Sequence, residues 1–233
     1  MVFFDNTNTY KDINYRLKKS DRKTTSIYIE RDGKILIIAP SPFNIEKIEK
    51  IIESKRSWIY RSLAEWEDLN RTRIHREYVN GESFLYFGRS YRLQLVAEQN
   101  EPLVFQHSQF KLKNSEAINA AEHFKNLYKV KLQKKLDERL ELYQSKMKLK
   151  PSGIRVMELQ NRWGSCTSKG LLNFHWKCSM LPLSVLDYVI VHELAHLEDN
   201  NHSPLFWRTV EKVIPNYHEA KTWLKFNGAG MSL

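Results

Sequence analysis

Apolar residues recur in patterns along the chain that predict a mixed α+β protein. Two β-rich runs, 25–30 and 34–39, flank residues 31–33 (Arg-Asp-Gly), a sequence typical of a hairpin turn. Asn44 is expected to cap the helix that follows, because isoleucines then recur at helical intervals and continue this pattern to about residue 70. The first third of the chain therefore predicts a small α+β unit.

Short β-rich segments follow this helix. Residues 83–87 and 91–96 predict a second hairpin that turns at residues 88–89 (Gly-Arg). Residues 103–106 and 109–112 predict a further pair of strands. A long helix from about residue 115 to 147 is expected next, because its apolar positions recur at helical intervals while lysines occupy the remaining surface.

The last third of the chain combines a few strands with a strongly apolar helix. Residues 183–191 are almost wholly apolar, which predicts a helix that is buried on most sides. Further helices are expected to begin near Ser203 and Tyr217. Three short β segments precede the apolar helix, at 154–159, 162–167 and 171–177. We expect two domains, an α+β unit over 1–114 and a catalytic domain over 115–233.

Composition narrows the class of protein. The 233 residues are 42% hydrophobic, enough for one sizeable core or two small ones. No apolar run approaches membrane-spanning length and no secretory signal pattern opens the sequence, so we expect no membrane partner. The two cysteines, Cys166 and Cys178, form no C-x-x-C pair and are expected to be small apolar side chains. A reducing cytoplasm is the location that this usage favours.

The formal net charge of +10 favours anionic partners. Many of the basic residues lie between 125 and 139 and between 146 and 150, within or just after the predicted long helix. Such runs are commonly the solvated face of a helix, and a weak nucleic-acid contact through this basic surface is the alternative. No zinc-finger, RNP or helix-turn-helix pattern accompanies the charge, and no pattern indicates an oligomeric state.

The chemistry is concentrated in the pattern H-E-x-x-H-x-x-x-x-x-H, formed by His192, Glu193, His196 and His202. At about 100° per residue, His192 and His196 lie about 40° apart around a helix, so both imidazoles leave one face. Neutral imidazoles suit Zn²⁺, and catalytic zinc keeps three protein ligands with one open position. Glu193 would then lie beside that position as a general base for an attacking water.

The third histidine requires a turn after the helix. In a continuous helix His202 would lie about 240° beyond His196 and face away from the metal. Asp199, Asn200 and Asn201 break helices readily, and we expect one of them to adopt a left-handed backbone angle. An H-E-x-x-H match can arise by chance, but the apolar helix, the helix-breaking run and the third histidine together favour a real zinc site.

Residues before this helix are candidates for contact with a substrate. In a small sheet beside a metal helix, the outermost strand can pair with an extended substrate, and we place residues 162–166 there. Arg162 could clamp a substrate anion or stabilise an oxyanion, or it could form a structural salt bridge to Glu158 or Glu198. Asn173 is a second candidate for substrate binding, although its strand face could equally point to solvent.

Together these residues resemble the YgjP-like family of predicted zinc-dependent hydrolases, which belongs to the zincin group and is related to the SprT-like and WLM proteases. The Ala-Pro at 39–40 and the Val-Asn-Gly-Glu at 79–82 also fit, so the resemblance spans nearly the whole chain. The main motifs that carry it are Asn161-Arg162-Trp163-Gly164-Ser165-Cys166, Leu172-Asn173-Phe174, the segment 188–196 and the segment 201–207.

The resemblance implies a zincin-like metallopeptidase fold, in which a small β-sheet accompanies the active-site helix. It also implies that His192, His196 and His202 are the zinc ligands and that Glu193 is the general base. A metallopeptidase that cleaves peptides or proteins is the function expected first. A nucleoside-triphosphate (UTP) pyrophosphatase that uses the same site is the alternative, and a metal-containing module that binds nucleic acid is the second alternative.

Overall fold

The computed structural model of the chain contains two compact units, Met1–Arg73 and Ile74–Leu233. The residues that it describes are 7–30, 32–70, 76–159, 162–228 and 230–233. The boundary between the two units lies between Arg73 and Ile74, about forty residues before the predicted domain boundary at 114/115. The strands and helices on both sides of residue 114 share one core, so they belong to the same unit.

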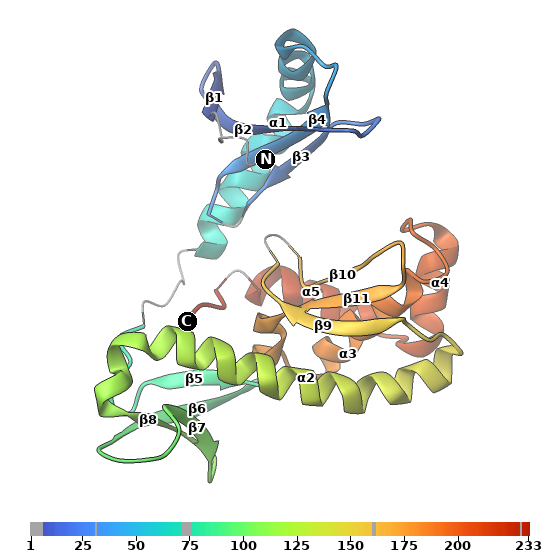
Figure 1. Cartoon of the computed structure of the whole chain (residues 1–233). Helices are drawn as coiled ribbons and strands as arrows, with labels where there is room; N and C mark the ends of the chain where they lie inside the picture. Colours follow the sequence, from blue (N-terminus) through green and yellow to red (C-terminus); the bar gives the residue numbers. More distant parts are fainter. Residues whose placement is uncertain (1–6, 31, 71–75, 160–161, 229) are drawn as a thin grey trace. The chain divides into compact units, whose positions relative to one another are not determined.

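The first unit is a four-stranded sheet with one long helix (Figure 1). The strands have the order β1-β2-β4-β3, and Ile48, Ile52 and Ile59 of the helix are fully buried in the core that they share with the sheet. The backbone N–H of Lys47 donates to Asn44 Oδ1 at 3.1 Å, so the predicted helix cap is confirmed. The elements are β1 (Thr7–Tyr10), β2 (Ile13–Ser20), β3 (Ser26–Ile29), β4 (Ile35–Pro40) and α1 (Ile45–Asn70).

Strands β1 and β2 were not predicted from the sequence. Ile13 and Tyr15 are buried and alternate with exposed Asn14, which is the pattern of a half-buried strand. The turn before them contains Lys11 at φ 53° instead of a glycine, so the usual sequence signal of a hairpin is missing. Of the predicted turn at residues 31–33, Arg31 lies outside the described residues and Gly33 has the positive φ, 81°, that such a turn needs.

The second unit begins with another four-stranded sheet, in the order β5-β6-β8-β7. Its first hairpin turns at Phe87 and Gly88, which both have positive φ, one residue earlier than predicted. The predicted long helix is preceded by a short 3₁₀ segment. The elements are β5 (Ser83–Tyr86), β6 (Arg89–Val96), β7 (Leu103–Gln106), β8 (Gln109–Lys113), η1 (Asn114–Asn119) and α2 (Ala120–Met147).

A three-stranded sheet and three helices complete the second unit. The sheet has the order β10-β11-β9, so the short strand β10 lies at its edge. No helix in the described part of the chain is long and apolar enough to cross a membrane. The elements are β9 (Gly153–Met157), β10 (Gly164–Cys166), β11 (Leu171–His175), η2 (Trp176–Met180), α3 (Leu183–Ala195), α4 (Pro204–Val213) and α5 (Tyr217–Asn227).

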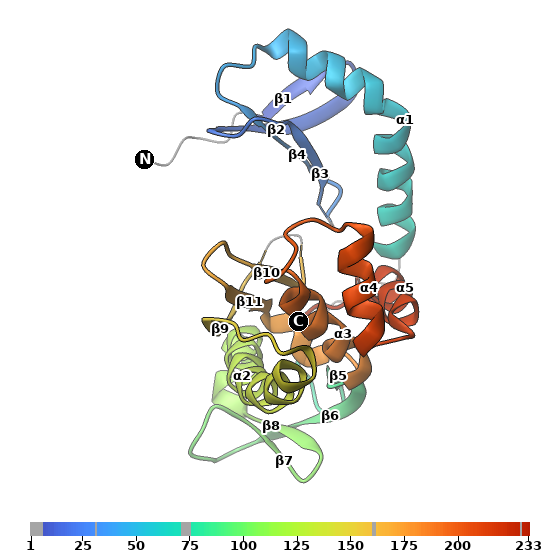
Figure 2. The same cartoon turned by 90° about the vertical axis from the view of Figure 1, so that its right-hand side faces the viewer.

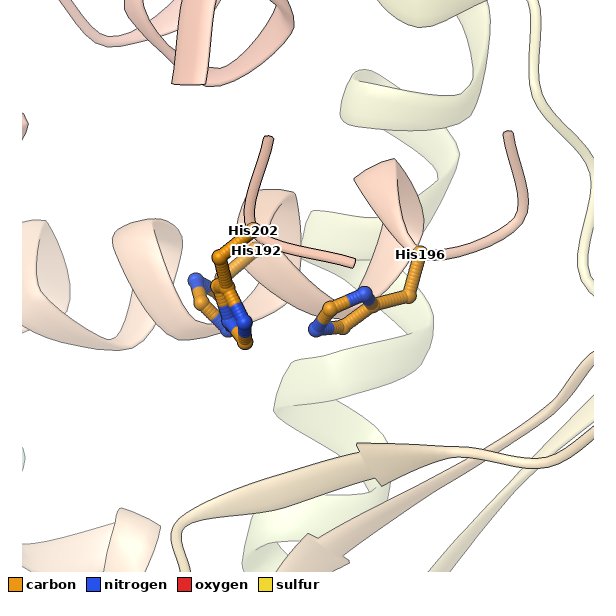
Figure 3. Close-up of side chains that lie close together, drawn as sticks. All are labelled: His192, His196 and His202. Carbon is orange, nitrogen blue, oxygen red and sulfur yellow. The ribbon is translucent and has the colours of Figure 1, made fainter. Parts of the chain in front are cut away.

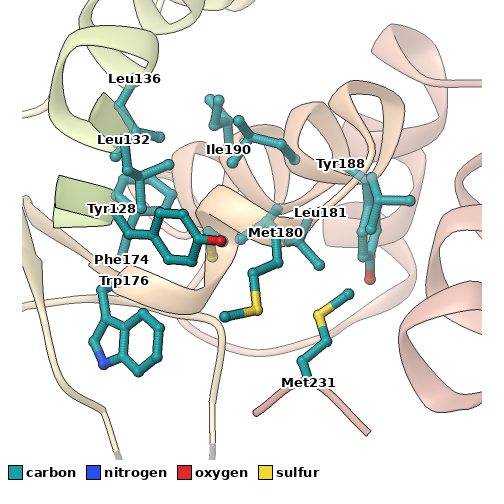
Figure 4. Packing of buried hydrophobic residues seen from close by; sticks show 14 of the residues in the cluster. Tyr128, Leu132, Leu136, Phe174, Trp176, Met180, Leu181, Tyr188, Ile190 and Met231 are labelled. Carbon is teal, nitrogen blue, oxygen red and sulfur yellow. The ribbon is translucent and has the colours of Figure 1, made fainter. Parts of the chain in front are cut away.

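Helix α2 runs between the two sheets of this unit (Figures 1 and 2). Every fourth residue from Ala120 to Leu140 is buried, so one narrow face of the helix enters the core. Figure 4 shows Tyr128, Leu132 and Leu136 on this face, with Phe174 of β11 and Ile190 of α3 in the same cluster. Val130 lies outside this face and is 68% exposed.

A nearly buried ion pair fixes α3 to α2. The Arg139 guanidinium donates from Nε to Asp187 Oδ1 at 2.7 Å and from its second nitrogen to Asp187 Oδ2. The Asp187 side chain is 10% exposed and that of Arg139 is 30% exposed. Forked contacts of this kind restrict both position and orientation, so the pair sets the placement of α3 along α2.

We predict that Asp187→Asn lowers the free energy of unfolding by about 2 kcal/mol, because it leaves a partly buried guanidinium without its charge partner. Urea unfolding of wild type and variant measures this difference. Glu138→Gln is the control, since it removes an exposed ion pair to Lys135 and should cost less than about 0.5 kcal/mol. Equal losses in the two variants would contradict a special role for the Asp187 pair.

Candidate metal centre

Helix α3 is buried on most sides, as its apolar sequence predicts. Every residue from Val185 to Val191 is buried, with at most 7% of its surface exposed. The helix contacts α2, α4, α5 and β10, so packing on several sides restricts its movement. His192 and His196, at the end of the helix, are half-buried and face the same side. A rigid platform of this kind suits a metal site, because ligand geometry must be held within a fraction of an ångström.

His202 joins the two helix histidines to form one cluster (Figure 3). One ring nitrogen from each residue lies within 4.8 Å of the other two, and the Nε2 atoms of His192 and His202 are 3.0 Å apart. Two nitrogen ligands of a tetrahedral zinc ion are separated by about 3.3 Å, from Zn–N bonds of about 2.05 Å. The three imidazoles are therefore close enough together to bind one metal ion.

A turn built on the Asp199 side chain brings His202 back to the helix. Asp199 Oδ1 accepts from the backbone N–H of Asn201 at 2.8 Å, and Oδ2 accepts from the Ser203 hydroxyl. The prediction of a left-handed backbone angle at Asp199, Asn200 or Asn201 is wrong, because all three have negative φ. Hydrogen bonds to the aspartate side chain replace the backbone angle as the cause of the turn.

The same turn orients His196. Its Nδ1 lies 3.0 Å from the carbonyl oxygen of Asp199, so the ring donates its Nδ1 proton there and presents Nε2 as the free nitrogen. Histidine ligands of metals are commonly fixed by such a contact with a carbonyl or carboxylate. Asp199 thus shapes the turn with its side chain and fixes the tautomer of His196 with its backbone carbonyl group.

Phe206 supports all three imidazole rings. Its ring centroid lies 5.0 Å from that of His192, 4.6 Å from His196 and 4.8 Å from His202, and it is almost fully buried. Burial, with a smaller effect of the other two histidines, lowers the pKa of His192 to about 3. It also lowers the pKa of His202. These two rings are therefore neutral near pH 7, which is the form that binds a metal.

Glu193 is a buried carboxylate beside this cluster. The residue is 5% exposed, and its Oε2 atom has no hydrogen-bond partner among the described residues. Burial raises its pKa to about 8, and the positive charge of Arg162 opposes this rise. A buried carboxylate without a partner costs free energy, and a nearby cation favours its ionised form. A cation held by the histidines would therefore lower this pKa.

Strand β10 reaches Glu193 because residue 164 has no side chain. A Cβ atom placed on Gly164 would lie 2.6 Å from both Cγ and Oε1 of Glu193. Real Cβ contacts are not this short, so a side chain at this position would displace the carboxylate. Gly164 is therefore the point where strand β10 and helix α3 approach each other closely.

The outer edge of β10 carries unpaired backbone groups. The Thr167 N–H donates to the Leu171 carbonyl of the neighbouring strand β11 at 2.9 Å. In an antiparallel strand every second residue directs its N–H and C=O groups to the partner strand, and the residues between them direct these groups to the other side. Thr167 faces β11, so Gly164 and Cys166 direct their N–H and C=O groups away from β11. Among the described residues no other strand pairs with β10. An extended chain could therefore add to this edge beside Glu193.

The two candidate substrate contacts lie in different surroundings. Arg162 is exposed two residues before β10, and its charge acts on Glu193. Within the described residues it forms no ion pair, and Glu158 pairs with Lys125. Asn173 Nδ2 donates to Ser165 Oγ at 3.2 Å. Its side chain points to the sheet face opposite that of its core neighbours, so it is not directed at Glu193.

Sequence reasoning did not identify the residues that support the site. Phe206 appeared only within the segment 201–207 that carries the family resemblance, and Asp199 was considered only as a helix breaker. Asn161, part of the motif that carries the resemblance, lies outside the described residues. Of the two cysteines, Cys178 is buried as expected and Cys166 is half-buried on β10.

Comparison with known proteins gives two matches and one negative result. A family model described as "YgjP-like, metallopeptidase domain" matches residues 23–227, which include the three histidines and Glu193. A solved structure, the metallopeptidase zymogen of Pyrococcus abyssi abylysin, is 25% identical; the match covers 38% of this chain and 90% of that chain, with a TM-score of 0.36. No curated protein matches. The family match supports a metal-dependent peptidase and gives no support to a UTP pyrophosphatase.

We predict that Gly164→Ala lowers the free energy of unfolding by about 1–3 kcal/mol, because the new methyl group overlaps the Glu193 carboxylate. Gly153→Ala, in β9 of the same sheet, is the matched control, because its methyl would meet only the flexible end of Leu171 at 3.3 Å. Urea unfolding compares the two variants. If both tolerate alanine equally, the contact between β10 and Glu193 is not tight in solution.

Proposed function

The chain belongs to the YgjP-like metallopeptidase family, and on that premise we propose that it is a zinc-dependent peptidase. His192, His196 and His202 would hold the ion, and Glu193 would be the general base. The observation that carries the proposal is the convergence of three ring nitrogens beside a buried carboxylate oxygen that has no protein partner among the described residues.

The donor set favours zinc over the other common ions. Three neutral imidazoles suit Zn²⁺, whereas Mg²⁺ and Ca²⁺ prefer oxygen ligands. With three protein ligands the first shell stays open at one position, as in catalytic zinc sites, and not closed as in structural ones. When bound, zinc would supply Lewis acidity toward water and toward the scissile carbonyl group.

Glu193 would move the proton during hydrolysis. In its ionised form the carboxylate accepts a proton from the attacking water and then donates it to the leaving amine. The oxygen that lacks a partner is available for this exchange, and burial keeps competing water away from it. The Gly164 contact limits the movement of the carboxylate on the strand side.

The edge of β10 would hold the substrate. An extended peptide that pairs with the outward backbone groups of Gly164 and Cys166 would lie directly alongside Glu193. Arg162, which is exposed and free of ion pairs within the described residues, would stabilise the oxyanion or bind a substrate anion. Asn173 remains a weaker candidate for substrate binding, because its side chain points to the other face of the sheet.

Other expectations from the sequence remain predictions. They are the cytoplasmic location, the choice between peptide and nucleotide substrates, and a weak nucleic-acid contact through the basic surface. The activity assay described below distinguishes the two substrate classes directly.

We predict that His202→Ala loses most of its bound zinc, because two imidazoles cannot complete the site. Elemental analysis after dialysis against a limited concentration of zinc gives the metal stoichiometry. His218→Ala is the control, since His218 is exposed on α5 and lies outside the histidine cluster. Unchanged zinc content in His202→Ala would remove this residue from the ligand set.

We predict that Glu193→Gln reduces peptide hydrolysis by at least about a thousandfold while the zinc content stays the same, because the general base is lost. The assay uses zinc-loaded protein with an unfolded protein substrate, and pyrophosphate release from UTP is measured in parallel. Glu198→Gln, an exposed residue of the same segment, is the control. Pyrophosphate release that depends on Glu193, without peptide cleavage, would replace the peptidase proposal by the nucleotide one.

A further inference from the structure

Lys221 of α5 lies next to Trp207 of α4, which borders the histidine cluster. The ammonium of Lys221 is 4.6 Å from the centre of the Trp207 ring. The same indole ring lies 5.6 Å from the ring of His202 and 5.9 Å from that of His192. Trp207 also stacks on Tyr217, which fixes the plane of the indole. The cation–π contact therefore holds a positive charge against an indole ring that borders two of the three histidines.

This charge has no counterion in the described structure. Lys221 is exposed, and no carboxylate of the described residues lies within ion-pair distance of it. The Trp207 ring that Lys221 contacts also neighbours the rings of His192 and His202. A cation at this position repels a metal ion held by the same histidines. An anion that lies between them would remove this repulsion.

We propose that Lys221 binds a carboxylate of the substrate and thereby selects which peptides are cleaved. The proposal rests on the proposed peptidase function, because carboxylates are the anionic groups of an unmodified peptide. The carboxylate could come from an Asp or Glu side chain near the scissile bond or from the free C-terminus of the chain. Lys221, on α5, would act as a specificity-determining residue, whereas Arg162 lies on a different segment, two residues before β10.

The direct test is a binding measurement with small probes on the zinc-loaded protein. Each probe carries a hydroxamate, which binds zinc, joined by one to three methylene groups to a carboxylate or to a neutral primary amide. Calorimetry gives Kd without any need for turnover. At the matching linker length we expect the carboxylate probe to bind roughly tenfold more tightly than its amide, as for one charge-assisted hydrogen bond.

Three variants determine whether Lys221 causes this preference. Lys221→Gln should abolish the preference for the carboxylate probe, and Lys221→Arg should retain it. Lys225→Gln removes the same charge one turn further along α5, at a lysine next to Phe226, and should leave the preference unchanged. Equal binding of carboxylate and amide by wild type at every linker length would overturn the proposal. An equal loss of preference in the two glutamine variants would overturn it as well.

A second experiment identifies the source of the carboxylate. Wild type and Lys221→Gln digest a mixture of defined peptides in which an acidic residue is placed at each position around the cleavage site, with free or amidated C-termini. Mass spectrometry gives the relative rates. A rate advantage for one acidic position assigns the carboxylate to a side chain, and an advantage for free C-termini assigns it to the chain end.

The two proposals fail in different ways. If wild type cleaves no peptide but the hydroxamate probes still show the Lys221-dependent preference, the peptidase function fails and the anion site stands. If peptides are cleaved with no advantage for any carboxylate, the role of Lys221 fails and the peptidase function stands.

Discussion

The burial of the Glu193 carboxylate is the constraint on which the rest of the metal centre depends. An ionisable group placed in an apolar interior is costly unless a charge or a hydrogen bond compensates it. Here one carboxylate oxygen has no such partner among the described residues, and burial raises the pKa of the group to about 8. The surrounding structure has to maintain this position, and packing on several sides of α3 provides the stability that it requires.

Each neighbour of Glu193 contributes to that position in a different way. Gly164 brings β10 into contact with the carboxylate, and Phe206 packs against the three imidazoles next to it in the site. The ion pair between Arg139 and Asp187 fixes α3 along α2. The metal centre is therefore a property of the whole second unit, and not of the H-E-x-x-H segment alone.

Much of this organisation could be predicted from the sequence. The helices and most of the strands followed from apolar spacing and turn residues, and the three histidines followed from a fixed pattern along one helix and the turn after it. Strands β1 and β2 were missed because Lys11, and not a glycine, occupies their turn. The domain boundary was placed too late because apolar spacing does not indicate which elements share a core. In the structure, α2 packs against both sheets of the second unit.

The parts of the site that could not be predicted depend on contacts between residues that are distant in sequence. A glycine gives no sign of which side chain will approach it, and an aspartate in a helix-breaking run gives no sign that its side chain, not its backbone angle, makes the turn. Sequence alone also does not show that Arg162 and Lys221 lack a carboxylate partner among the described residues, because Glu158 pairs with Lys125 instead. Sequence reasoning identified the candidate metal ligands and the candidate general base, and it left open the residues that hold them in place.

The open edge of β10 has a consequence for the physical state of a substrate. Its outward groups can pair only with a backbone whose own N–H and C=O groups are free, and in a folded protein most of these are already occupied. The strand is three residues long, so such pairing gives few hydrogen bonds with which to open a stable helix or sheet. If peptides bind along this edge, denatured chains, termini and long loops would be cleaved in preference to intact domains. Such discrimination would be conformational, and it would act before any side chain of the substrate is recognised.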